Sequence, residues 1–194
     1  MYDIPCVILS GGKSSRMGED KSLLPFGNCD SLVEYQYKKL SKLFQKVYIS
    51  SKTNKFNFKH NLILDNEENI SSPMIALQSI FNSLDNKKVF IITVDTPLIL
   101  DETINTLIKQ SPNHDIIIAT DKDRDHNLCG VFDKNILPII TDLISKKIHK
   151  INHLIREVND AKKVAFNNKE QFINLNTYND YKQALFISKT NISY

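Results

Sequence analysis

The stretch CVILSGGKSSRMGEDKSLLPFG, residues 6–27, decides how this chain folds. It joins a short apolar run to a segment that holds four of the five glycines in a chain of 194 residues. A short apolar run that ends in glycines is typical of a buried strand followed by a tight loop. In open α/β sheets, ligands bind in the loops at the carboxyl ends of the strands. The stretch therefore predicts a first strand and a ligand-binding loop.

Apolar runs of the same kind recur along the chain, each too short for a helix. They cover residues 4–9, 47–49, 62–64, 89–94 and 116–119. Helical periodicities lie between them, one behind a capping box of Ser31 and Glu34 and one behind Ser72 and Pro73. Further helices are expected from Asp101 as a cap, through Ile136, Ile140 and Ile144, and from Thr177 with Asp180. The alternation predicts an α/β fold with three layers and a doubly wound, mostly parallel sheet.

One further run, residues 128–132, follows the fifth strand after the short charged turn DKDRDH. A parallel crossover needs a dozen or more residues, and this link is shorter. The run therefore predicts an antiparallel excursion in the sheet.

Composition limits the class of protein. The length and the 41% hydrophobic content suit a single domain over residues 1–187, followed by a frayed polar tail over residues 188–194. A net charge of +3 is a weak field, so no nucleic-acid partner is expected. Without a basic leader or an apolar run near the ~20 residues of a membrane span, we expect a cytoplasmic protein with no membrane partner. The three cysteines are isolated and are expected to be reduced thiols.

The glycine segment has the chemistry of a phosphate site. It contains Gly-Lys-Ser, but the P-loop pattern requires a glycine where Val7 stands, and no G-x-G-x-x-G occurs. Glycines allow successive backbone N–H groups to point at an anion, and Arg16 and Lys21 add positive charge. The segment therefore predicts a polyphosphate site of another design. The alternative is a turn that only joins strand to helix.

Residues 9–24 fit the pattern L-x-G-G-x-S-x-R-M-G-x-D-K-x-L-L without a gap. This pattern resembles the signature of the molybdenum cofactor guanylyltransferases, within the nucleotide-diphospho-sugar transferase-like superfamily of Rossmann-like nucleotidyltransferases. The resemblance implies GTP as donor and molybdopterin as acceptor. It implies catalytic roles for Arg16, Lys21 and Asp95. It also implies that GTP contacts Leu9, Ser10, Gly11, Gly12, Lys21, Ser50, Asp65 and Asp95.

Asp95 lies in the segment ITVDTPLI, which matches the Asp-x-Pro element of that family. A carboxylate at the carboxyl end of a buried strand is suited to hold Mg²⁺ beside bound phosphates. Asp95 is therefore the expected metal ligand, with Mg²⁺ as cofactor. The alternative is a turn or capping aspartate.

Two later segments carry the expected acceptor-binding residues. DRDHNLCGVF resembles a family segment that places Arg124 and His126 near the acceptor, although a solvated charged turn is equally consistent with it. FINLNTYNDY resembles the closing element of the family, which implies that Asn174 and Asn176 approach the site.

The chain departs from the family at two places. The glycines of Gly-Pro-x-x-Gly are replaced by Ser72 and Ala76, and a position that is often Asn is Ser50. Separately, His149 and His153 have the i, i+4 spacing of metal ligands on a helix, but HExxH is absent and we expect them to be exposed.

The expected reaction is Mg²⁺-dependent transfer of GMP from GTP to the molybdopterin phosphate, with release of pyrophosphate. The expected partners also include molybdoenzyme chaperones or other cofactor-biosynthesis proteins. Gly11 stands where the cytidylyl branch tends to carry Ala, which implies guanine. A missing methyl group here would leave room for a purine. The alternatives are a cytidylyl- or uridylyltransferase acting on another small phosphorylated acceptor, and a non-catalytic cofactor-binding chaperone.

Overall fold

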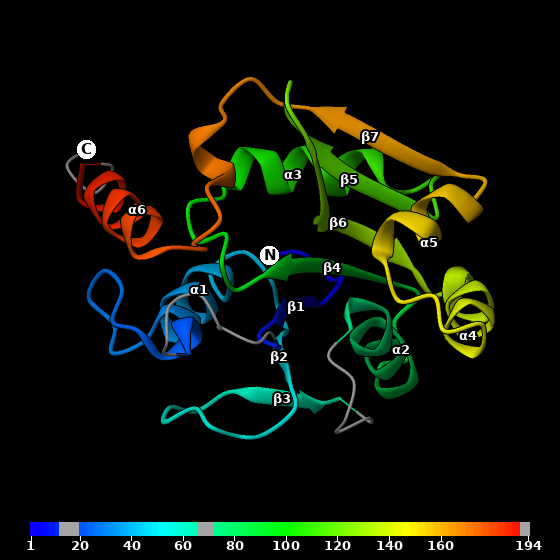
Figure 1. Cartoon of the computed structure of the whole chain (residues 1–194), viewed down its shortest axis with the longest axis horizontal. Helices are drawn as coiled ribbons and strands as arrows, with labels where there is room; N and C mark the ends of the chain where they lie inside the picture. Colours follow the sequence, from blue (N-terminus) through cyan, green and yellow to red (C-terminus); the bar gives the residue numbers. More distant parts are fainter. Residues whose placement is uncertain (12–19, 66–71, 191–194) are drawn as a thin grey trace.

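A seven-stranded sheet forms the centre of the fold, and the computed structural model describes residues 1–11, 20–65 and 72–190. The strands are β1 (Cys6–Leu9), β2 (Val47–Ser51), β3 (Asn61–Leu64), β4 (Lys88–Thr93), β5 (Ile116–Thr120), β6 (Asp125–Asp133) and β7 (Ala161–Ala165). The helices are α1 (Leu32–Leu40), α2 (Pro73–Ser83), α3 (Asp101–Gln110), α4 (Leu137–Ser145), α5 (Ile151–Glu157) and α6 (Tyr178–Thr190). Short 3-10 helices are η1 (Lys21–Leu23), η2 (Lys134–Ile136) and η3 (Glu170–Phe172). The strand order is β3-β2-β1-β4-β6-β5-β7 (Figure 1).

Strand β6 runs antiparallel to both of its neighbours, β4 and β5, whereas the other paired strands run parallel. The predicted antiparallel excursion is therefore confirmed. Its physical reason is the short connection after β5, which leaves room for a reversal but not for a crossover helix.

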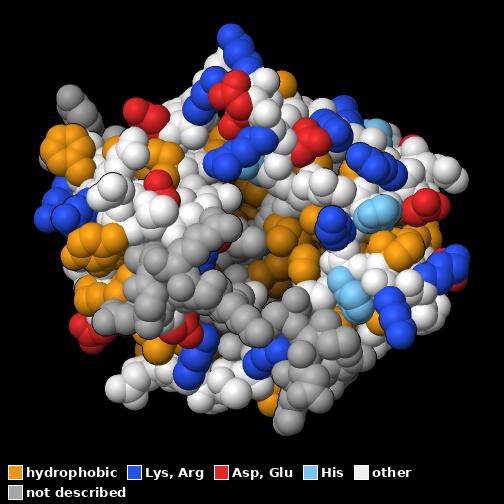
Figure 2. Space-filling model, viewed as in Figure 1, with side chains coloured by type: hydrophobic (Ala, Val, Ile, Leu, Met, Phe, Trp, Pro, Cys, Tyr) orange, Lys and Arg blue, Asp and Glu red, His pale blue; other side chains and the backbone are white. Residues whose placement is uncertain are grey.

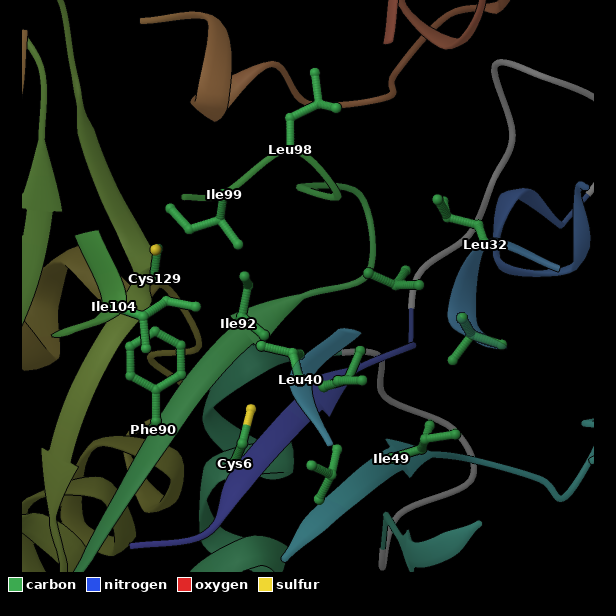
Figure 3. Packing of buried hydrophobic residues seen from close by; sticks show 14 of the residues in the cluster. Cys6, Leu32, Leu40, Ile49, Phe90, Ile92, Leu98, Ile99, Ile104 and Cys129 are labelled. Carbon is green, nitrogen blue, oxygen red and sulfur yellow. The ribbon is translucent and has the colours of Figure 1, made fainter. Parts of the chain in front are cut away.

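The helices cover both faces of the sheet (Figure 1). One hydrophobic cluster joins α1, α3 and α6 to side chains such as Cys6, Ile8 and Phe90. Figure 3 shows part of it, with Cys6, Phe90 and Ile92 in the same layer. The other cluster joins α2, α4 and α5 to the alternate strand positions, such as Val7 and Ile91. Successive strand side chains point to opposite faces, so strands buried on both sides are apolar at every position. The predicted three-layer α/β fold is confirmed.

Strands β2 and β3 are added to one side of β1, and β4 and the later strands are added to its other side, so the strand order reverses at β1. Strand β1 lies between β2 and β4, and Leu9 pairs with Ser50 on one side and Thr93 on the other. Helix α1 packs on one face of the sheet and α2 on the opposite face. Ligands in open α/β sheets bind at such a switch point, outside the carboxyl ends of the strands. The fold thus opens a crevice beside the residues that follow β1 and β4.

Three of the predicted helix starts are confirmed. Ser31 Oγ accepts from the backbone N–H of Glu34 at 3.3 Å, and Ser72 Oγ accepts from that of Met74 at 3.1 Å. Thr177 and Asp180 exchange bonds between side chain and backbone, as a capping box requires.

The prediction that Asp101 caps α3 was wrong. Leu100 is the cap residue, and Asp101 is the first residue of the helix. The backbone N–H of Leu100 is held by Gln171 Oε1 at 3.2 Å. Asp101 still favours the helix start because its negative charge lies near the positive end of the helix dipole.

The sequence patterns missed β7 and misplaced the end of α6. The segment AKKVA has too few apolar residues to predict a strand, as is common at sheet edges, where lysines discourage further pairing. A frayed tail was expected from Ser188, but α6 continues to Thr190 and Ser188 is buried. Ser188 lies on the same side of the helix as the buried Tyr181 and Ala184, which explains its burial.

In the described part of the chain, none of the helices combines the length and the apolar character that a membrane span requires.

Candidate functional site at the carboxyl ends of β1 and β4

A cavity of ≈ 370 Å³ opens at the switch point, and Figure 2 shows the molecule hollowed near the centre of the view, with hydrophobic side chains inside. We call it the first cavity. Residues from several parts of the chain line it. They are Leu9, Ser10, Gly11, Asp20, Lys21, Ser22, Ser50, Lys52, Asp65, Ser72, Pro73, Ala76, Thr93, Val94, Asp95 and Leu128. All of the predicted GTP-binding residues that the structure describes are among them.

Residues 9–11 bring the end of β1 to the first cavity. Ser10 is buried, and its Oγ has no hydrogen-bond partner in the described part of the chain. Buried hydroxyl groups are normally paired, so an unpaired one on a cavity wall suits a polar ligand. Gly12 and Arg16, also predicted to bind or act on the nucleotide, lie outside the described residues.

Lys21 and Asp95 form an ion pair on the wall of the first cavity. Lys21 Nζ lies 2.7 Å from Asp95 Oδ2, and both side chains are largely buried, at 18% and 19% exposure. Lys21 also donates to the Leu175 carbonyl at 3.2 Å. Two of the three residues predicted to be catalytic, 74 positions apart in the sequence, are therefore in direct contact.

The turn that carries Asp95 is held by groups that the sequence patterns did not reveal. The side chain of Gln36 in α1 is buried, and its Nε2 donates to the Thr93 carbonyl at 3.2 Å and to the Thr96 carbonyl at 2.9 Å. The backbone N–H of Leu175 donates to the Asp95 carbonyl at 2.9 Å. A buried polar residue on the core side of a helix was the one available signal for Gln36. These bonds restrict the backbone on both sides of the carboxylate.

The donor set around Asp95 suits Mg²⁺ only together with a ligand. The described residues contain no group of three or more His, Cys, Asp or Glu side chains able to hold a metal. Mg²⁺ is commonly bound by one or two carboxylates, with substrate phosphates and water completing the octahedron. Among the described residues, Asp95 has the carboxylate chemistry of such a ligand.

Asp65 and Ser50 form a second polar pair in the first cavity. Ser50 Oγ donates to Asp65 Oδ1 at 2.8 Å, and a β-carbon placed on Gly11 would lie 3.5 Å from Asp65 Oδ2. Burial raises the pKa of the Asp65 carboxyl, and the Ser50 hydrogen bond and the charge of Lys52 partly offset this.

The amino-terminal end of α2 also faces the first cavity, through Ser72, Pro73 and Ala76. The glycines of the family pattern are absent here, but the helix end still offers backbone N–H groups and a positive dipole.

A second cavity, of ≈ 330 Å³, adjoins the first. Both are lined by Thr93, Asp95 and Leu128. The second cavity is further lined by Thr96, Arg124, Asp125, His126, Asn127, Cys129, Ile151 and Asn174. Asp95 therefore stands where the two cavities meet.

His126 is fixed in the second cavity by a partner that the sequence analysis missed. Its Nε2 lies 2.9 Å from Asp121 Oδ2, and its ring stacks on Phe172 with centroids 4.0 Å apart. Burial raises the pKa of Asp121, but the backbone N–H groups of Asp123 and Arg124 and the side chain of His126 outweigh it and lower that pKa to about 2. Burial lowers the pKa of His126 and the Asp121 carboxylate partly offsets this, so the neutral imidazole is favoured.

The other expected acceptor residues differ in their placement. Arg124 lines the second cavity and donates from Nη2 to the Phe172 carbonyl at 2.9 Å. Asn174 lines it too, and its Oδ1 accepts from Thr96 Oγ1 at 3.0 Å. Asn176 is exposed and lines neither cavity, and its backbone N–H donates to Asp180 Oδ2 in the turn before α6.

His149 and His153 do not share a helix, contrary to the sequence interpretation. Helix α5 begins at Ile151, with Lys150 as its cap, so His149 precedes it. His153 is exposed as expected, whereas His149 is only half-exposed and its Nδ1 is buried without a partner in the described residues.

Comparison with known proteins gives a consistent result. The family model described as "MobA-like NTP transferase domain" matches residues 6–163. A molybdenum cofactor guanylyltransferase of Campylobacter jejuni subsp. doylei is 40% identical over 188 residues, covering 94% of this chain and 96% of that protein. A molybdenum cofactor guanylyltransferase of Helicobacter pylori is 33% identical over 192 residues, covering 96% of this chain and 94% of that protein.

Solved structures share the fold. The molybdopterin-guanine dinucleotide biosynthesis protein A of Archaeoglobus fulgidus superposes with a TM-score of 0.81 at 17% identity, covering 96% of this chain and all of that one (100%).

Proposed function

The chain belongs to the molybdenum cofactor guanylyltransferase family and is a nucleotidyltransferase, and from this premise we propose that it transfers GMP from GTP to the terminal phosphate of molybdopterin. The names of the Campylobacter and Helicobacter relatives support the choice of donor and acceptor. The products are pyrophosphate and the molybdopterin guanine dinucleotide.

One observation carries the proposal: two adjoining cavities meet at Asp95. Transfer between two substrates requires that both are held with their reacting groups at a common point. GTP is assigned to the first cavity, which is lined by Gly11, Lys21 and the amino-terminal end of α2. Molybdopterin is assigned to the second, with its phosphate toward Asp95 and its pterin toward His126 and Arg124.

The reaction itself asks little acid–base chemistry of the protein. An acceptor phosphate oxygen forms a bond to the α-phosphorus of GTP, the bond from the α-phosphorus to the bridging oxygen breaks, and the electron pair leaves with pyrophosphate. The nucleophile is already an anion, so positioning and charge neutralisation are the main contributions. We assign to Lys21, which pairs with Asp95 on the cavity wall, the role of offsetting charge on the departing phosphates, and we assign the same role to Arg16.

Asp95 is assigned as the protein ligand of Mg²⁺, whose charge would neutralise the phosphate oxygens that it contacts. Lys21 pairs with Asp95. Bound phosphates would attract Lys21 away from this pair and would leave the Asp95 carboxylate open to the metal ion. We therefore expect the metal to bind far more tightly with GTP than alone. Titration of Mn²⁺ followed by electron paramagnetic resonance, with and without GTP, measures this directly.

The activity test is release of pyrophosphate with molybdopterin and Mg²⁺ present, with GTP as donor and CTP as the comparison. Asp95→Ala and Lys21→Ala should each lower kcat by on the order of a hundredfold or more, as removal of single charge-stabilising groups does elsewhere. Asp85→Ala is the matched control, because Asp85 is exposed and lines neither cavity. Preference for CTP, or near-normal turnover in both site variants, would contradict the proposal.

A further inference from the structure

The loop between β4 and α3, which carries Asp95, is hydrogen-bonded to two side chains of α1. Gln36 Nε2 donates to one backbone carbonyl before Asp95 and to one after it. Lys39 lies three positions further along α1, and residues with this spacing share a face of a helix. Lys39 Nζ donates to the Pro97 carbonyl at 3.3 Å and to the Ile99 carbonyl. Lys39 therefore holds the part of the loop that follows Asp95.

The ammonium group of Lys39 is bound to backbone and is largely removed from water. Burial lowers the pKa of Lys39, and the charge of Asp101 partly offsets this. A buried charge is costly unless its donors are satisfied, so Nζ and the two carbonyls hold one another in place. Leu98 and Ile99 of the loop also belong to the same hydrophobic cluster as Leu40 of α1 (Figure 3). Such packing has no preferred direction, whereas hydrogen bonds orient the peptide groups that accept them.

The restraint gains importance when a ligand is bound. Without a ligand, the Asp95 carboxylate is oriented by its ion pair with Lys21 at 2.7 Å. Once phosphates attract Lys21, the carboxylate is oriented by the backbone that carries it. A carboxylate on a loosened loop would have to be ordered when it binds a metal ion, and that ordering lowers the affinity.

Resting on the proposed function, which makes Asp95 the ligand of Mg²⁺, we propose that Lys39 is a positioning residue that keeps the Asp95 carboxylate in the orientation the metal ion requires. Lys39 acts through the backbone of the loop and not on the reacting atoms. Its removal should therefore weaken binding of the metal ion and leave the binding of GTP itself nearly unchanged.

Lys88 provides a matched control, because it is a second lysine that donates to two backbone carbonyls. Its Nζ donates to the Ser111 carbonyl at 2.8 Å and to the His114 carbonyl at 2.6 Å, and its side chain is 14% exposed. Lys88 is the first residue of β4, whereas Asp95 lies beyond the last one, so the two are at opposite ends of the strand. Lys38 of α1, which is 61% exposed, is the surface control.

The test is titration of Mn²⁺ followed by electron paramagnetic resonance, with the protein in excess over GTP so that the nucleotide is bound. We expect Lys39→Met to raise the Kd of Mn²⁺ about tenfold, because a hydrogen bond from a charged donor is worth at least that much. Lys39→Arg, which keeps the charge and several donors, should stay within about threefold of the wild type. Lys88→Met and Lys38→Met should stay within about twofold, as substitutions away from a site do.

A second measurement separates positioning from general damage. The affinities for metal and GTP are linked, so the Kd of GTP is measured by calorimetry with EDTA in place of the metal. In Lys39→Met it should change less than about twofold, since the proposed restraint concerns the metal ligand alone. Circular dichroism at the assay temperature shows that each variant is folded. If Lys39→Met does not fold, Lys39→Gln, which keeps a donor and removes the charge, replaces it in the same comparison.

The proposal is overturned if the Lys39 variant binds Mn²⁺ in the presence of GTP as tightly as the wild type, or if Lys88→Met weakens this binding as much. It is also overturned if the Lys39 variant loses affinity for GTP without metal to the same extent. Failure of the proposed function would look different, because the wild-type protein itself would then bind Mn²⁺ no more tightly with GTP than alone.

Discussion

Alanine at Gly130 should destabilise the fold more than alanine at any other described glycine. Gly130 lies in β6, between Ile91 of β4 and Ile118 of β5. A β-carbon there would lie 1.9 Å from the Ile117 carbonyl oxygen, and real β-carbons essentially never approach closer than 3.0 Å. Strands β5 and β6 would have to separate by about 1.1 Å, the difference between these two distances.

The expected cost follows from two terms. Overpacking in a well-packed interior costs about 1–3 kcal/mol, and each ladder hydrogen bond that is lost costs about 0.5–1.5 kcal/mol. We therefore expect the free energy of unfolding of Gly130→Ala to fall by roughly 2–4 kcal/mol. For a chain of this size that corresponds to a fall in Tm of roughly 5–15 °C.

The other described glycines provide graded controls. Gly27 has φ +58° and its β-carbon would lie 3.0 Å from the Tyr35 ring, so Gly27→Ala should cost about 1–2 kcal/mol for the left-handed backbone. At Gly11 the nearest contact would be 3.5 Å, an ordinary distance, and Gly11→Ala should change stability by less than about 0.5 kcal/mol.

Urea unfolding followed by far-ultraviolet circular dichroism measures all three, because the chain has no tryptophan to serve as a fluorescence probe. The m-value must be unchanged for the energies to be compared. A Gly130→Ala protein within about 0.5 kcal/mol of the wild type, or less affected than Gly27→Ala, would refute the reasoning from sheet geometry.

Three further predictions concern buried polar groups. Gln36→Met removes the donor to the buried Thr96 carbonyl, so the free energy of unfolding, measured in urea, should fall by about 1–3 kcal/mol. The same change should lower kcat, because it loosens the turn that carries Asp95. The folded-state pKa of Asp121 is lowered to about 2, so its stabilising effect is complete above the ordinary value of 3.8 and is lost as the pH falls toward 2; Asp121→Asn should flatten the pH dependence of stability in that range. Cys29 should react with a thiol reagent in the native protein, whereas the two buried cysteines, whose pKa values burial raises, should react only on unfolding.

The fold was predictable where burial leaves a mark in the sequence. Strands β1, β4 and β5 are buried on both faces over most of their length, so each contains a continuous apolar run that the sequence shows directly, and β2 contains a shorter one over residues 47–49. Strand β7 borders the sheet and is half solvated, so its lysines resemble a loop. A ligand-binding loop after the first strand was also predicted, and the pairing of β1 with β4 brings Gly11 and Asp95, which follow these strands, to one end of the sheet.

The groups that hold the site leave no comparable pattern. Gln36 and Leu175 fix the turn of Asp95 through backbone carbonyls or a backbone N–H, so the residue types at the other end of these bonds are nearly free to vary. Asp121 acts through a hydrogen bond to His126, five positions away, in a turn whose composition also suits solvent exposure. A sequence motif shows the side chains that contact a ligand. The residues that hold the backbone in place are spread over the chain, and many residue types could fill their positions, so they form no motif.

The hydrogen bonds around Asp95 show how restraint of the backbone affects the chemistry. Its carboxylate is paired with Lys21, its carbonyl with the backbone of Leu175, and the preceding strand with Gln36. A preorganised charge needs no reorganisation when the substrate charge develops, which is the main source of electrostatic catalysis. Residues that restrain the turn should therefore affect kcat more than their distance from the phosphates suggests, and exchanging Gln36 tests this separately from exchanging Asp95 itself.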